Sequence, residues 1–202
     1  MWQKISEIGE KVVGAGLVEA NFGNISVRSG SGNSFLITKT KTALDEIQKD
    51  GVIEMPIFCD GDETYVDAET LKEMEKAASS ETPIHRRIYA ETKAKAILHA
   101  HCPYAVVMSI LESEAGSASI VPVDSEGKLF LKEIPIVSGG IGSDELAKNA
   151  VDALKNVKGI IILGHGTIAA GETLEEAYHI TAQLEHSAKI KYLYAAAKNI
   201  YR

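Results

Sequence analysis

Short apolar runs typical of β-strands alternate with amphipathic helical segments along almost all of this 202-residue chain. Each element has an apolar face that must be covered, so the alternation predicts a layered α/β or α+β fold. We find no internal repeat or low-complexity linker and expect a single domain over residues 1–202. The expected strands are 24–28, 34–38, 96–100, 121–123, 134–137 and 160–163, and the expected helices are 5–17, one starting at 79–83, 103–111, 143–157 and 173–199.

The first two strands are joined by a glycine- and serine-rich segment, residues 29–33, which has the composition of a hairpin turn. The following stretch, residues 42–72, has a less regular pattern. We expect a short helix at 44–48, strands at 52–58 and 64–66, and a turn at 60–62.

The overall charge excludes one large class of partners. The chain has 21 Lys and Arg against 28 Asp and Glu, a net charge of -7, so it offers no positive field to nucleic acid. An anionic substrate would therefore have to be bound locally, by a few amides, hydroxyls or a metal.

The cysteines and the hydropathy pattern indicate where the chain works. Cys59 and Cys102 are too few for a disulfide framework, which favours a reducing compartment. Neither a signal peptide nor a segment of transmembrane length is present. We expect a cytoplasmic protein with no membrane partner.

Three histidines form the strongest chemical signal. His99 and His101 lie two residues apart in an expected strand, so they share one face, with Cα atoms about 6.6 Å apart. Alone, such a pair can equally be hydrogen-bonded within a strand. His165, between two glycines at the end of an apolar run, supplies a third imidazole. Three histidines plus an open position are the ligand pattern of a catalytic zinc site, although Mn²⁺ or Co²⁺ would also suit.

The start of the helix at 79–83 offers complementary groups. Ser79 and Ser80 combine hydroxyls with unpaired N–H groups, which can bind an anion or simply cap the helix. Glu81 is the natural candidate for a metal ligand, a general base, or both. One turn later, His85 either supports that carboxylate or has a surface or packing role.

Several other polar residues have ordinary interpretations. Asn24 and Thr40 lie at strand ends, where ligands often bind, yet each also suits a turn. Cys102 points away from His101 and is expected in the core, while His179 and His186 line one face of the last helix.

Seven short motifs follow one another from residue 23 onward: GNISVR at 23–28, LITKT at 36–40, SSE at 79–81, HRRIY at 85–89, HAH at 99–101, GHG at 164–166 and GETLEEA at 171–177. Glu185 comes after the last of them. In this order they resemble the class II aldolase/adducin family, which includes fuculose-phosphate aldolases and ribulose-phosphate epimerases.

The resemblance implies a three-layer α/β/α fold with a mostly antiparallel central sheet. It also implies zinc on His99, His101 and His165, with Glu81 as acid/base and further metal ligand. The resemblance further implies a homotetramer with active sites at subunit interfaces.

By the same resemblance, Asn24, Thr40, Ser79 and Ser80 would hold the phosphate of a small sugar phosphate. Lys41 stands where the family usually has glycine, and it either adds a cation for the substrate or is solvated. No tyrosine occurs at 121–126, where fuculose-phosphate aldolase has its proton donor, so that role is unassigned.

The implied reaction is aldol cleavage of a fuculose-1-phosphate-like substrate to dihydroxyacetone phosphate and an aldehyde, through a metal-stabilised enediolate. Family epimerases usually have Asp where this chain has Glu81, which favours the aldolase. A metal-dependent decarboxylase, dehydratase or 4-epimerase of a sugar (acid) phosphate is the alternative. A non-catalytic adducin-like interaction domain fits less well, since such domains need not keep the histidines.

Overall fold

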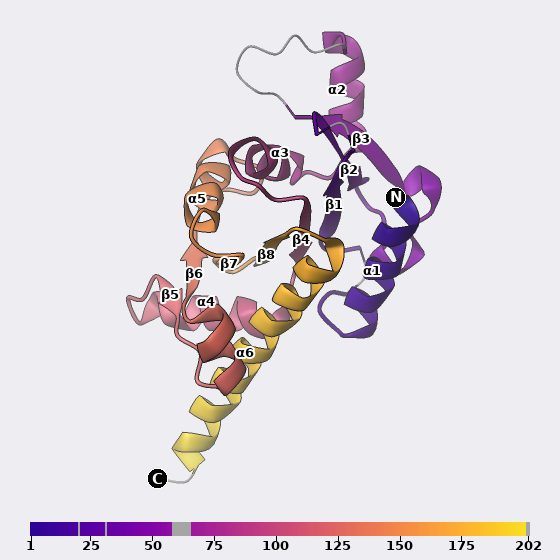
Figure 1. Ribbon diagram of the computed structural model, residues 1–202. Coiled ribbons are helices and arrows are strands. Elements are labelled where there is room, and N and C mark those ends of the chain that lie inside the picture. Colours follow the sequence, from indigo (N-terminus) through magenta and orange to yellow (C-terminus); the bar gives the residue numbers. More distant parts are fainter. Residues whose placement is uncertain (20, 31, 58–65, 201–202) are drawn as a thin grey trace.

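A central eight-stranded sheet organises the molecule (Figure 1). The computed structural model describes residues 1–19, 21–30, 32–57 and 66–200. The strands follow the spatial order β3-β2-β1-β4-β8-β7-β6-β5, and of these neighbours only β6 and β7 run parallel. The mostly antiparallel sheet is therefore confirmed. Its strands are β1 Asn24–Arg28, β2 Ser34–Thr38, β3 Val52–Pro56, β4 Ala96–Ala100, β5 Ser119–Ile120, β6 Ile134–Val137, β7 Gly159–Ile162 and β8 Gly166–Gly171.

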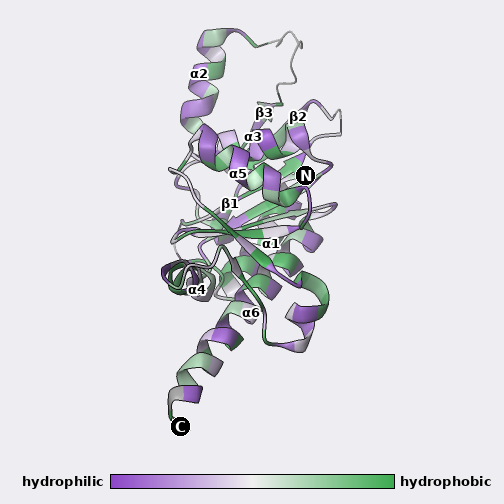
Figure 2. Cartoon of the chain, turned by 90° about the vertical axis from the view of Figure 1, so that its left-hand side faces the viewer, coloured by the Kyte–Doolittle hydropathy of each residue, from purple (hydrophilic) through white to green (hydrophobic). Residues whose placement is uncertain are grey.

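Helices cover both faces of the sheet, which gives the expected three layers (Figure 2). α1, α4 and α6 pack on one face, and α3 and α5 pack on the other. The helices are α1 Trp2–Gly14, α2 Ala68–Ala77, α3 Thr82–Glu91, α4 Pro103–Glu114, α5 Asp144–Leu154 and α6 Leu174–Ile200. Shorter helical turns are η1 Leu44–Glu46, η2 Lys49–Gly51 and the π-helical η3 Gly127–Leu131.

Strand β7 shows why the sheet needs two helical layers. Ile160 and Ile162 belong to the apolar cluster under α3 and α5, whereas Ile161 belongs to the cluster under α1, α4 and α6. Successive side chains of a strand point to opposite faces, so an unbroken apolar strand requires cover on both sides.

Two elements differ from the sequence-based expectations. Residues 121–123 are not a strand, since the pairing stops at β5, where Ile120 lies opposite Ile134. Pro122 follows, and it has no N–H to offer a ladder. Strand β8 was not predicted, because its glycine- and alanine-rich sequence is a weak strand former that β4 and β7 hold from either side.

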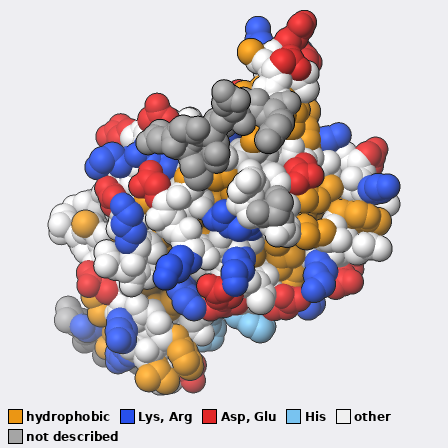
Figure 3. All heavy atoms as spheres, turned by 45° about the horizontal axis from the view of Figure 1, so that its top comes forward, with side chains coloured by type: hydrophobic (Ala, Val, Ile, Leu, Met, Phe, Trp, Pro, Cys, Tyr) orange, Lys and Arg blue, Asp and Glu red, His pale blue; other side chains and the backbone are white. Residues whose placement is uncertain are grey.

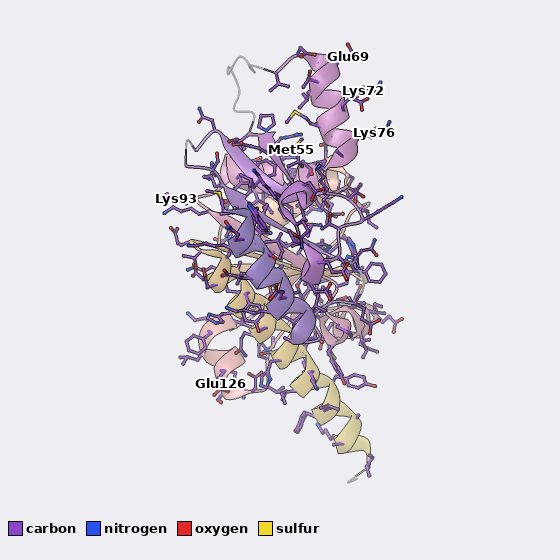
Figure 4. All side chains as sticks on the ribbon, turned by 90° about the vertical axis from the view of Figure 1, so that its right-hand side faces the viewer. Met55, Glu69, Lys72, Lys76, Lys93 and Glu126 are labelled. Atoms are coloured by element: carbon purple, nitrogen blue, oxygen red, sulfur yellow. The ribbon has the colours of Figure 1, made fainter. Side chains whose placement is uncertain are left out.

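The segment after β3 was only partly predictable. Helix α2 was not expected there, although Asp67 caps it by accepting hydrogen bonds from the N–H groups of Glu69 and Thr70. None of its residues is buried, and Figure 4 shows the side chains of Glu69, Lys72 and Lys76 projecting outward. The turn at 60–62 and most of the strand expected at 64–66 lie outside the described residues.

The long helix α6 begins with the predicted capping motif, since Thr173 Oγ1 accepts a hydrogen bond from the Glu176 N–H at 3.1 Å. Its C-terminal turns extend away from the rest of the molecule in Figures 1 and 2. None of the helices in the described ranges has the length and apolar character needed to cross a membrane.

Candidate active site

One cavity contains every side chain selected from the sequence as a catalytic, metal or substrate ligand. Its volume is about 270 Å³. It lies at the N-terminal end of β1 and the C-terminal end of β4, next to the β7–β8 turn and the start of α3. The predicted residues that line it are Asn24, Thr40, Lys41, Ser79, Ser80, Glu81, His99, His101 and His165.

Two glycines allow the strands to approach closely enough to form this cavity. A Cβ on Gly23 would lie 2.5 Å from the carbonyl oxygen of His99, and a Cβ on Gly166 would lie 2.4 Å from that of Ala100. Only glycine fits at such separations. As a result, Asn24 lies directly opposite His99 across the β1–β4 ladder, and the β7–β8 turn places His165 beside β4.

Backbone hydrogen bonds bring the Thr40 loop to the start of α3. The Thr40 N–H donates to the carbonyl of Ala77 at 3.0 Å, and the Ser79 N–H donates to the carbonyl of Thr38 at 3.2 Å. Thr40, Ser79 and Ser80 thus all line the cavity.

The imidazoles of His99, His101 and His165 converge. Their ring centroids are 4.6–4.9 Å apart, and one nitrogen from each lies within 4.8 Å of the others. His99 is 1% exposed, whereas the other two are partly open to the cavity.

The hydrogen bond made by His99 fixes its tautomer. Its Nδ1 lies 2.9 Å from the carbonyl oxygen of Thr167, which can only accept, so Nδ1 carries the hydrogen and Nε2 has a free lone pair. A backbone carbonyl in this position is the usual orienting partner of a metal-binding histidine.

Burial keeps these imidazoles neutral. It lowers the pKa of His101 to about 4, with a further contribution from His165, and lowers the pKa of His165 itself. The pKa of His99 falls well below its usual value, first through burial and then through its two histidine neighbours. Neutral imidazoles are the form that binds metal.

Unsatisfied buried atoms support a divalent ion at this place. Among the described side chains, His99 Nε2 and His165 Nδ1 are buried without a hydrogen-bond partner, as are both carboxylate oxygens of Glu81. Such atoms are costly to bury unless a ligand satisfies them. Three imidazoles form a donor set that suits zinc, whereas Glu81 is not among the side chains whose ligand atoms lie within 4.8 Å of one another.

Glu81 lies in an environment that favours its neutral form. The side chain is 4% exposed, and burial raises its pKa to about 7. It is the N-cap residue of α3, but its carboxylate does not cap the helix. Ser79 Oγ accepts a hydrogen bond from the Glu81 N–H at 3.3 Å, and no side chain of the described residues caps the first turn of α3, so the expected hydroxyl cap is not found. A carboxyl with a pKa near neutrality suits proton transfer in both directions.

Lys41 has a left-handed backbone with φ of 63°, a conformation that glycine adopts most readily. The chain therefore keeps the backbone shape that suits glycine while carrying a charged side chain at the cavity. Lys39 lines the same cavity.

The apolar residues at the mouth of the cavity were not predicted. Phe22 stacks on His101 with ring centroids 5.2 Å apart and ring planes 2° from parallel, and it is 50% exposed. Ile141 from the β6–α5 loop lines the same mouth and is 67% exposed. In the sequence, Phe22 stands out as a large apolar residue within the polar segment 21–24, and this contrast could have marked it as a site residue.

The remaining histidines and Cys102 lie elsewhere. Cys102 belongs to the core, as expected, and His179 and His186 are exposed on α6. His85 is fully buried, and burial lowers its pKa to about 3.

A larger hollow of about 740 Å³ lies between η3 and α6, with Phe130, Lys158 and His179 in its lining. It contains none of the clustered metal-ligating side chains found in the described part of the chain. Size alone therefore does not make it the active site.

Known proteins share both the sequence pattern and the fold. L-fuculose phosphate aldolase of Haemophilus influenzae is 28% identical over 184 residues, which cover 91% of this chain and 78% of the relative. The 5-methylthioribulose-1-phosphate/5-deoxyribulose-1-phosphate aldolase of Rhodospirillum rubrum is 25% identical over 185 residues, covering 91% and 76%.

The crystal structure of L-fuculose-1-phosphate aldolase from Thermus thermophilus superposes with a TM-score of 0.82 at 30% identity, covering 98% of this chain and 95% of that one. Residues 3–192 also match the family model described as Class II Aldolase and Adducin N-terminal domain. Together with the three-layer fold, this match over nearly the whole chain shows that the protein belongs to the class II aldolase and adducin family.

Proposed function

We propose that this protein is a zinc-dependent lyase that cleaves a small sugar 1-phosphate, similar to fuculose 1-phosphate, to dihydroxyacetone phosphate and an aldehyde. The observation that carries the proposal is the convergence of three neutral imidazoles, a buried carboxyl and a hydroxyl-lined pocket in one cavity. The aldolases among its relatives act on ketose phosphates of this kind. We place the enzyme in the cytoplasm and treat residues 1–202 as one domain.

His99, His101 and His165 would hold the metal ion, with Glu81 as a further ligand. A divalent ion at this position supplies Lewis-acid polarisation of a carbonyl or hydroxyl oxygen. The hydrogen bond from His99 Nδ1 to Thr167 keeps Nε2 directed into the site without rearrangement.

Glu81 would carry the proton. Since burial raises its pKa to about 7, the carboxyl accepts and releases a proton near neutral pH at little free-energy cost. Its carboxylate oxygens have no competing partner within the described residues, so they are available to the substrate.

The phosphate of the substrate would lie at the other end of the cavity. Asn24, Thr40, Ser79 and Ser80 offer amide and hydroxyl donors, and Lys41 adds a positive charge. These groups bind and orient the substrate so that its reacting carbons face Glu81.

The decisive experiment incubates the zinc-loaded protein with dihydroxyacetone phosphate and a panel of short aldehydes. Condensation to a ketose 1-phosphate is the expected result. Turnover of a ketose or sugar-acid phosphate by loss of water, loss of CO₂ or inversion, with no condensation, would replace the aldolase by a dehydratase, decarboxylase or epimerase. The dehydratase has one specific observation in its favour, namely a bifunctional relative named as a probable methylthioribulose-1-phosphate dehydratase, 25% identical over 194 residues.

We also propose a homotetramer whose active sites lie at subunit interfaces. Exposed apolar residues line the cavity, since Phe22 is 50% and Ile141 67% exposed. Such residues are typical of surfaces that a partner covers. Light scattering on the eluting protein should give about four times the chain mass of 21.7 kDa, and a monomer at working concentration would rule the assembly out.

A further inference from the structure

A buried polar ladder runs behind the proposed active site, between β1 and α3. Asn24, Ser26 and Arg28 alternate along β1 and face α3, where Glu81, His85 and Tyr89 follow one another at four-residue spacing. Ser26 and His85 are fully buried and Tyr89 is 1% exposed. The ladder is unusual in an otherwise apolar layer, and the proposed function uses only Asn24 and Glu81.

Ser26 connects the two helix residues behind Glu81. Its Oγ lies 2.7 Å from His85 Nδ1 and 2.7 Å from the Tyr89 hydroxyl. A serine hydroxyl has one hydrogen, so it donates to only one of these neighbours and accepts from the other.

Counting hydrogens decides between the two arrangements. If Ser26 donated to Tyr89, the buried phenol hydrogen of Tyr89 would have no acceptor among the described residues, and the bare lone pair on His85 Nε2 would have no donor. If Tyr89 donates to Ser26 and Ser26 donates to His85 Nδ1, then only His85 Nε2 of these three side chains lacks a hydrogen-bond partner. In this arrangement Nε2 carries the hydrogen of the imidazole. Since each unsatisfied buried group costs about 1–3 kcal/mol, the second arrangement is favoured.

Two acceptors on this ladder are buried without a partner among the described residues, Asn24 Oδ1 on β1 and the Glu81 carboxylate one helical turn from His85. The carboxylate oxygens of Glu81 are buried without a partner, just as His85 Nε2 is. Side chains four residues apart are neighbours on a helix, and helical side chains lean toward the N-terminus, which directs His85 toward the turn that holds Glu81. The two groups are not hydrogen-bonded in the structure, so a contact between them requires the Glu81 side chain to rotate.

We propose that His85 is a positioning residue, whose Nε2–H, fixed by the chain of hydrogen bonds from Tyr89 through Ser26, holds the Glu81 carboxylate when it turns away from the three histidines. Glu81 thereby has two defined positions, one at the cavity and one on His85. The catalytic part of this inference rests on the proposed role of Glu81 as proton carrier.

The tautomer can be measured without any substrate. In a long-range ¹H–¹⁵N correlation spectrum of the full-length, zinc-loaded protein, His85 should show a protonated Nε2 and a bare Nδ1, with its signals assigned by their loss in His85→Gln. A protonated Nδ1 would overturn the proposal. Tyr89→Phe removes only the phenol donor, so it should introduce a population of the other tautomer, and an unchanged spectrum would remove Tyr89 from the chain.

The contact with Glu81 has its own signature. With dihydroxyacetone phosphate bound, so that Glu81 has turned away from the three histidines, the Nε2–H proton of His85 should lie further upfield in Glu81→Gln than in wild type, because a neutral amide oxygen is a weaker acceptor than a carboxylate. The exposed Glu69→Gln on α2 is the control and should leave the resonance unchanged. An identical resonance in wild type and Glu81→Gln would contradict the contact.

Kinetics complete the test. His85→Phe should lower kcat about tenfold or more with little change in KM, and His85→Gln, which keeps an N–H donor at the same position, should recover most of the rate. Equal rates in wild type and His85→Phe would overturn the role of His85. If wild-type protein turns over no sugar phosphate, the proposed function fails while the spectra still decide the hydrogen-bond chain. A bare Nε2 in an active enzyme would refute this inference alone.

Discussion

At the scale of single residues, the site combines groups that are unfavourable for folding and useful for chemistry. Glu81 is buried with both oxygens unsatisfied, and Lys41 adopts a backbone conformation that costs a non-glycine residue about 1–2 kcal/mol. Residues of this kind persist only where the surrounding structure holds them, and they cluster at functional sites.

The burial of Glu81 predicts a pH-dependent gain in stability when its charge is removed. Its pKa is about 7 in the folded protein against an ordinary value of 4.5, so the unfolded chain loses the proton first as pH rises. The metal-free protein should therefore lose stability between pH 4.5 and 7, by about 3 kcal/mol once ionisation is complete. Glu81→Gln should be more stable than wild type by up to that amount at pH 8 and equal to it at pH 4, as measured by urea unfolding.

Glu69→Gln, which removes an exposed carboxylate on α2, is the matched control and should show no such trend. A stability difference between Glu81→Gln and wild type that stays constant from pH 4 to pH 8 would contradict the burial argument. In the same variant we expect metal to be retained and turnover to be lost.

Lys41→Gly tests whether the cation at the cavity serves the substrate. We expect KM for a phosphorylated substrate to rise up to about tenfold, since an exposed charge contributes less than a buried one. Stability should change by less than about 1 kcal/mol, because relief of the left-handed backbone offsets the greater freedom of unfolded glycine. Lys93→Ala, on the exposed surface labelled in Figure 4, should change neither quantity, and a KM unaltered in Lys41→Gly would show that the side chain is only solvated.

At the scale of elements, the site depends on strand β8 lying against β4. Ala100 is opposite Thr167 in the ladder, and Thr167 both orients His99 through its carbonyl and donates a hydrogen bond to the Ala100 carbonyl at 3.2 Å. Glu185 of α6 accepts hydrogen bonds from the N–H groups of Tyr104 and Ala105 in the first turn of α4, which begins two residues after His101. The metal ligands are thus held by pairing and capping on both sides.

Gly166→Ala should disrupt this element contact. The added Cβ would lie 2.4 Å from the Ala100 carbonyl oxygen, so β8 must move away from β4. We expect a loss of stability of about 1–3 kcal/mol and weaker metal binding, measured by chemical unfolding and by titration with zinc. Gly30→Ala, where an added Cβ meets nothing within 4 Å, is the control, and similar behaviour of the two variants would show that the close approach is unimportant.

At the scale of the whole molecule, an acidic chain concentrates its means of binding anions in one place. The net charge is -7, and on the face shown in Figure 3 positive and negative side chains are interspersed. The cavity instead gathers Lys39, Lys41, helix N–H groups and the proposed metal ligands. Under the proposed function, this concentration of donors and positive charge at one place would let an acidic chain bind the phosphate of its substrate.

Metal binding should stabilise the whole fold, because its ligands come from β4 and the β7–β8 turn, which meet only in the folded state. Zinc at a hundred times its dissociation constant should add about 2.7 kcal/mol and raise Tm by about 5–10 °C. His101→Ala should abolish both the bound metal and the shift. A wild-type protein that is free of divalent metal after purification without chelators, and whose Tm does not respond to zinc, would favour a non-catalytic adducin-like role.

Much of the fold could be predicted from local sequence because its signals are periodic. The apolar repeat of α1, the strands around the 29–33 turn and the capping motif before α6 were all predicted correctly. Strand β8 and helix α2 were missed, since the first depends on its neighbours and the second buries no residue.

The sequence by itself determined the layered class of the fold, the acidic surface and the identities of the candidate ligands, because these depend on residue type and spacing. Tertiary structure alone decided that residues from 24 to 165 share one cavity, since strand pairing joins positions far apart in the chain. It also decided the free nitrogen of His99, the raised pKa of Glu81 and the contacts of His85, because hydrogen-bond partners and burial exist only once the layers have packed.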